Sequence, residues 1–110
     1  MQVRNTEYEF TLPIGYRDGE GTLHRHGVMR LATAGDEILP LKDHRVQANP
    51  AYLMVLVLAR VVVRLGSLDI VNSKVIEDLF MADYHYLQAL YHKINGVEGD
   101  GDSGGAPAQR

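Results

Sequence analysis

The feature that most constrains this sequence is a long apolar run between Asn49 and Gly66. Asn49 is a favourable helix N-cap, Pro50 suits the first helical position, and Gly66 suits a left-handed C-cap. These signals predict one helix, although the many β-branched residues also fit a buried strand. Arg60 and Arg64 are four residues apart, which places them on one face of the predicted helix.

Such a helix is apolar on nearly every side, so it must be covered on nearly every side. Arg60 interrupts the run well before the roughly 20 residues that a bilayer requires, so we expect no membrane insertion. Two alternatives remain open. The helix is either the core of a small domain, or its surface is completed by a partner or by a second copy of the chain.

The chain has 110 residues and a net charge of −3, and we interpret residues 1–96 as a single domain. The charge balance does not favour a nucleic-acid-binding protein, which would show a basic stripe. The sequence has no cysteine, which excludes disulfides and thiolate chemistry. Because the N-terminus lacks the apolar segment of a signal peptide, we expect a cytoplasmic protein.

The N-terminal part has the pattern of a β-hairpin. Tyr8–Leu12 alternates apolar and polar residues, as in a half-buried strand, and Pro13 should limit its pairing. Gly15–Gly21 has the composition of a turn, and Thr22–Leu31 forms the second predicted strand. Gly27 within that strand predicts a bulge or a bend.

Short helices should follow the hairpin. Thr33 and Asp36 have the spacing of a capping box, which predicts a short helix over Ala34–Leu39 that stops before Pro40. Asp43–Ala48 is predicted to form a second short helical turn.

The last predicted helix extends over Lys74–Ile94 and is capped by Asn72 or Ser73. Its apolar residues follow a helical spacing that only Asp83 interrupts, and a break near Asp83 would fit the pattern. Residues 97–110 are rich in Gly, Asp and Ser, so we expect a disordered tail. The predicted fold class is therefore α+β, an N-terminal β-hairpin followed by a small helical domain.

Few residues point to chemistry. His24 and His26 are two apart on a strand, which suits a metal site, but the alternative is exposed polar residues on the outer face of the hairpin. Asp36 and Glu37 are either an acid/base pair or, as we favour, partners of the helix dipole. Asp83 either lines a pocket with nearby tyrosines or faces solvent or a partner.

The sequence contains neither a phosphate-binding glycine loop nor a nucleophile elbow, so we expect no enzymatic activity and no cofactor. Arg60 and Arg64 are unusual charges for an apolar helix. They either orient the helix against a bound protein or pair with carboxylates of the chain. The available carboxylates are Asp36, Glu37, Glu77, Asp78 and Asp83.

Segments over about residues 7–95 resemble small tail-assembly proteins of tailed phages and of phage-tail-like contractile particles. The matching segments are FTLPIG at 10–15, GTLHRHGVMRLATAGDEI at 21–38, AYL at 51–53 and VIEDLF at 75–80, followed by Asp83 and Leu87. The similarity is closest to the tail assembly chaperones. No active-site residues carry over, and Arg30, Thr33, Asp36 and Asp83 are matching positions with a structural or partner-facing role.

The resemblance implies a non-enzymatic assembly factor that coats the tape-measure protein or another tail component before the tube forms, without a cofactor. The alternative is a small structural adaptor that is retained in the assembled particle. A second copy of the chain is a further expected partner. The residues that we expect to contact a partner are Tyr52, Leu56, Arg60, Arg64, Phe80, Asp83 and Leu87.

Overall fold

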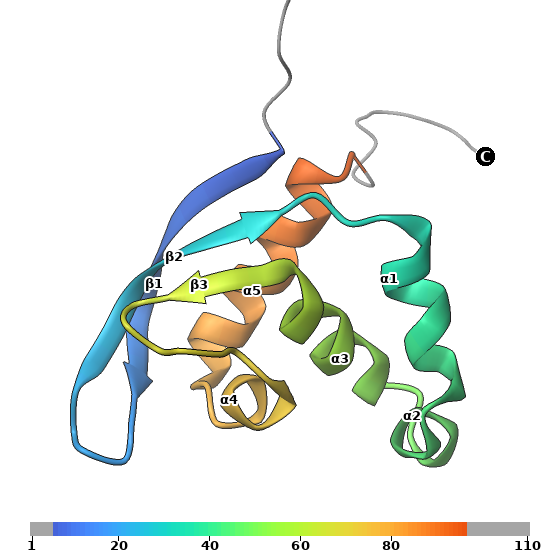
Figure 1. Ribbon diagram of the computed structural model, residues 1–110, viewed down its shortest axis with the longest axis horizontal. Helices are drawn as coiled ribbons and strands as arrows, with labels where there is room; N and C mark the ends of the chain where they lie inside the picture. The colour runs from blue at the N-terminus through green and yellow to red at the C-terminus, as the bar shows by residue number, and fades with distance from the viewer. Residues whose placement is uncertain (1–5, 97–110) are drawn as a thin grey trace, which may run out of the picture.

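A computed structural model of the chain describes residues 6–96. In chain order the elements are β1 (Glu7–Arg17), β2 (Leu23–Arg30), α1 (Ala34–Ile38), the 3-10 helix η1 (Leu39–Lys42), α2 (His44–Ala48), α3 (Tyr52–Val61), β3 (Val62–Leu65), α4 (Ser73–Glu77) and α5 (Met81–Ile94). The strands form one antiparallel sheet in the order β1-β2-β3, which lies beside the helices (Figure 1). The predicted α+β fold with an N-terminal hairpin is confirmed. The prediction for residues 97–110 lies outside the described residues.

The apolar run does not form one helix. It begins as α3 and changes to β3 at Val62, which pairs with Met29 of β2. Three consecutive valines end the helix, and β-branched side chains fit a strand well once a neighbouring strand is available. The prediction of a helix up to Gly66 is therefore wrong over its last residues, and Arg64 belongs to β3.

Gly66 closes the strand instead of capping a helix. Its φ is +56°, and its N–H donates to the carbonyl of His26 at 2.7 Å. A Cβ at this position would lie 2.1 Å from Nδ1 of His24. Gly66 is thus required both by its backbone conformation and by the imidazole packed against it.

The first strand is longer than predicted, because β1 continues through Pro13 to Arg17. Its register shifts on the way: Thr11 lies opposite His26, whereas Tyr16 lies opposite His24. Residues 12–15 therefore leave the ladder with β2. Pro13 is tolerated within this irregular segment, where the lack of an N–H group costs no ladder bond.

Gly27 lies in register opposite Phe10 and Leu65. A Cβ here would lie 2.4 Å from the ring of Phe10 and 2.5 Å from the carbonyl oxygen of Arg64. Close packing of the Phe10 ring against β2 therefore explains this glycine.

Two of the predicted helix caps are present, but the N-cap predicted at Asn49 is wrong, because α3 begins at Tyr52 with Ala51 as its N-cap and Asn49 instead ends α2. Asp36 accepts from the Thr33 N–H at 2.8 Å, and Asn72 accepts from the Val75 N–H at 3.1 Å, as predicted. The helical backbone does not stop before Pro40, since this residue lies inside η1.

The predicted helix over Lys74–Ile94 is interrupted. α4 ends at Glu77 and α5 begins at Met81, with an extended Phe80 between them. The break lies a few residues before the predicted position at Asp83.

The core lies between the sheet, α3, α4 and α5. Its fully buried centre includes Leu12, Met29, Val57, Leu58, Val61, Leu65, Leu87 and Tyr91. Within residues 6–96, no helix has the length and apolarity that crossing a bilayer would require.

Candidate functional site

Asp36 is the centre of a polar network that joins three elements. Its buried carboxylate pairs with Arg30 at the end of β2 at 2.7 and 3.1 Å, and with Nε of Arg60 in α3 at 2.9 Å. The bidentate hydrogen bonds from Arg30 hold the pKa of Asp36 far below its usual range. A carboxylate bound in this way is a poor proton acceptor. Of the two alternatives that the sequence left open for Arg60, pairing with a carboxylate of its own chain is therefore the one that the structure shows.

Asp83 has an equally structural role. It is fully buried in the first turn of α5, and its carboxylate accepts from the N–H groups of Ile14 and Gly15 at 2.8 and 2.9 Å. The prediction that Asp83 faces solvent or a partner is therefore wrong. The tyrosines do not form a pocket around it either, because Tyr86 packs edge-to-face on Phe10 and Tyr91 lies in the core.

His24 is buried, so the prediction that it lies on the exposed face of the hairpin is wrong. Its Nε2 lies 2.9 Å from a carboxylate oxygen of Asp18, and its Nδ1 accepts from the N–H of Ser67 at 3.3 Å. The hydrogen bond from His24 lowers the pKa of Asp18. These bonds tie the hairpin turn to the segment after β3. Among residues 6–96, no group of three or more His, Asp or Glu side chains is placed to hold a metal.

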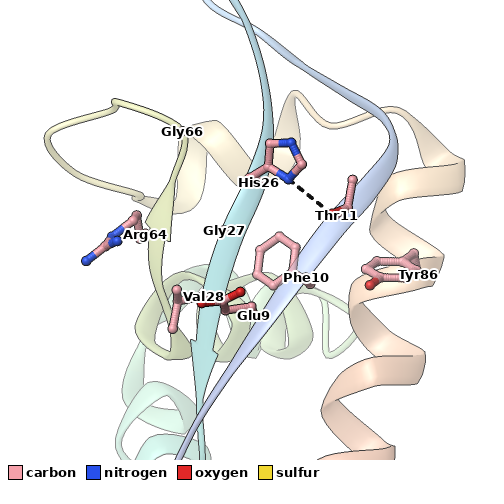
Figure 2. A pocket seen from close by; sticks show the side chains of 9 residues that line it. All are labelled: Glu9, Phe10, Thr11, His26, Gly27, Val28, Arg64, Gly66 and Tyr86. Carbon is pink, nitrogen blue, oxygen red and sulfur yellow. Dashed lines mark hydrogen bonds between the residues drawn. The ribbon is translucent and has the colours of Figure 1, made fainter.

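His26 is exposed and borders a hollow of about 720 Å³ over the sheet (Figure 2). The ring of Phe10 lies in the middle of the view, Tyr86 points toward it from α5, and Arg64 points away. His26 Nδ1 lies 3.1 Å from the hydroxyl of Thr11. In the described part of the chain no side chain hydrogen-bonds the other ring nitrogen of His26. The pair therefore lacks the third group that orients the base in a nucleophilic site.

An apolar candidate surface lies on the N-terminal half of α3. Every residue of its N-terminal half, Tyr52–Leu56, is only partly buried, whereas Val57, Leu58 and Val61 in its C-terminal half are fully buried. We call Tyr52–Leu56, with the grooves beside it, the α3 surface. The C-terminal half of the helix therefore belongs to the core of the domain, whereas its N-terminal half is only partly buried within the domain.

Three grooves flank this surface. The η1 groove, of about 490 Å³, separates α3 from η1 and is lined by Leu39, Leu56, Arg60 and Val71 among others. The α5 groove, of about 570 Å³, lies between α3 and α5 and is lined by Glu37, Leu53, Met54, Tyr84 and His92 among others. The α4 groove, of about 350 Å³, lies toward α4 and is lined by Tyr52, Val55, Ile76, Glu77, Met81 and Tyr84 among others.

Exposed apolar residues continue beyond the η1 groove. Ile38 is 59% exposed, and Leu39 and Leu41 are about half exposed. These residues were not among the predicted contact residues. The sequence did contain a signal for this exposed surface, because three large apolar residues surround Pro40 in a helical stretch that is too short to bury them.

The structure brings together only some of the residues predicted to contact a partner. Tyr52 and Leu56 lie on the α3 surface, and Arg60 borders it. Arg64 lies apart on β3. Phe80 is exposed at the junction of α4 and α5, where the chain passes from one helix to the next.

Leu87 is buried in the core, so its prediction as a contact residue is wrong. The helical spacing that marked Leu87 is equally typical of a residue facing the inside of the domain.

Comparisons of the chain with protein-family models, with curated proteins and with solved structures found no match.

Proposed function

We propose that this protein is a non-enzymatic assembly factor that binds a helical segment of another protein on the α3 surface. The observation that carries the proposal is the division of α3 into a fully buried half and a partly buried apolar half that is lined by grooves. A contiguous apolar surface with grooves is typical of a protein-binding site. The adjoining grooves suit the apolar face of an amphipathic helix.

The polar groups of the fold support the same proposal. Asp36, Asp83 and His24 are each bound within the domain, where they hold the sheet, α1, α3 and α5 together. These interactions make a rigid support for the partly buried end of α3. A rigid support lowers the conformational entropy lost on binding.

The resemblance to tail assembly chaperones suggests the class of partner. We propose that the protein acts in the cytoplasm of the producing cell on a component of a phage tail or a contractile injection particle. The tape-measure protein is the leading candidate, because a long helical protein presents many apolar stripes. No cofactor is needed for such a role.

The test is co-expression of the full chain with the tape-measure protein encoded nearby, combined with mass spectrometry of purified particles. Capture of the tape measure together with absence from mature particles is the expected result. Presence of the protein in mature particles would instead indicate the retained structural adaptor. Failure to capture any tail component, with absence from the particles, would contradict both roles.

A further inference from the structure

Two exposed carboxylates flank the partly buried part of α3, and each is held by a tyrosine. The hydroxyl of Tyr91 donates to Glu37, and the hydroxyl of Tyr52 donates to Glu77. A hydrogen bond from a fixed phenol orients each carboxylate and leaves its remaining lone pairs free for a second donor. Both carboxylates are thus positioned before any partner arrives.

The two carboxylates belong to adjoining grooves. Glu37 lines the α5 groove and Glu77 lines the α4 groove, and Tyr84 lines both. Leu53 and Met54 of α3 line the α5 groove, and Val55 lines the α4 groove. The two grooves therefore adjoin at Tyr84, with one carboxylate in each, and we call the pair of grooves the trough.

The acidic side chains that line the trough are Glu37 and Glu77. Among residues 6–96, neither Glu37 nor Glu77 forms an ion pair, and no Lys or Arg lines either groove. Arg45, which interacts electrostatically with Glu77, pairs with Asp43 at 2.9 Å and stacks on the ring of Tyr52. The η1 groove differs, because Lys42 and Arg60 line it.

From this arrangement we infer that the bound segment is an amphipathic helix with Lys or Arg beside its apolar stripe, seated in the trough between Glu37 and Glu77. The inference rests on the proposed function and specifies which grooves are used and which partner charge they select. Basic side chains of the partner would donate hydrogen bonds to the free lone pairs of both carboxylates, whereas acidic side chains would be repelled by them.

The test uses the full chain and two labelled helical peptides of about 18 residues, long enough to span roughly 27 Å. Both carry the same leucine stripe, flanked by Lys in one peptide and by Glu in the other. Fluorescence anisotropy should show that the Lys peptide binds about tenfold more tightly, as expected for two surface charge pairs against two repulsions. In the double variant Glu37→Gln/Glu77→Gln this preference should fall below about twofold.

The matched control is Glu9→Gln/Glu20→Gln, which removes the same charge from the hairpin and should keep the preference. Equal binding of both peptides by the wild-type protein would overturn the inference while leaving helix binding, and so the proposed function, in place. Binding of neither peptide would contradict the inference and the proposed function together.

Discussion

The carboxylate of Asp83 in α5 accepts a hydrogen bond from the backbone N–H of Gly15 in β1 at 2.9 Å, across 68 positions of sequence. A second bond, from the Ile14 N–H, makes this one carboxylate the partner of two consecutive amides. On the other side of the same irregular segment, Arg25 donates to the carbonyl of Leu12 at 3.0 Å. Side chains thus replace the ladder bonds that β1 loses here, because buried backbone groups must be paired.

The variant Asp83→Asn should destabilise the domain by about 1–3 kcal/mol, because one of two buried N–H groups would face an amide donor. Urea unfolding followed by circular dichroism measures the change. The matched variant Asp78→Asn alters an exposed carboxylate near the end of α4 and should change stability by less than about 0.5 kcal/mol. Equal stability of the two variants would show that Asp83 does not support the sheet.

Asp36 should make the domain sensitive to acid. Its pKa is lowered in the folded protein, so its contribution to stability is present above the unfolded pKa of about 3.9 and is lost as the pH falls below it. The free energy of unfolding should therefore drop more between about pH 6 and pH 3 in the wild type than in Asp36→Asn. Parallel pH profiles for the two proteins would contradict this role.

Gly66→Ala should be strongly destabilising. The left-handed backbone costs an L-residue about 1–2 kcal/mol, and the new methyl group would meet the ring of His24 as well. We expect a loss of about 2–4 kcal/mol, measured by thermal or urea unfolding. Gly19→Ala is the control, since a Cβ there meets nothing within 4 Å. Similar losses in both variants would mean that the close approach to His24 is unimportant.

Local signals in the sequence predicted much of the fold. Thr33 with Asp36 and Asn72 with Val75 act within one turn of the chain, so their caps could be recognised from spacing alone. The hairpin could be recognised for the same reason. The predictions that failed concern residues whose structure depends on contacts with residues far away in the sequence. Val62 becomes a strand residue because β2 lies beside it, and a valine run by itself fits a helix or a strand.

The candidate site shows the same division. Tyr52 and Leu56 were predicted from the apolar run and lie on the α3 surface. Asp83 and Leu87 were misassigned because a helical stripe does not distinguish a residue that faces a partner from one that faces the core. Glu37 and Glu77 gain their significance only from the tyrosines that the fold brings to them.

The measurement that most directly tests the account is partner capture by Leu56→Asp. Leu56 is only partly buried on the α3 surface and lines the η1 groove, so the variant should remain folded while placing a charge directly beside the trough in which the partner helix packs. Leu23→Asp, the same change on the exposed hairpin, is the control. We predict that Leu56→Asp loses capture of the co-expressed tape-measure protein and that Leu23→Asp retains it. A soluble, folded Leu56→Asp protein with full capture would contradict the claim that α3 is the binding surface.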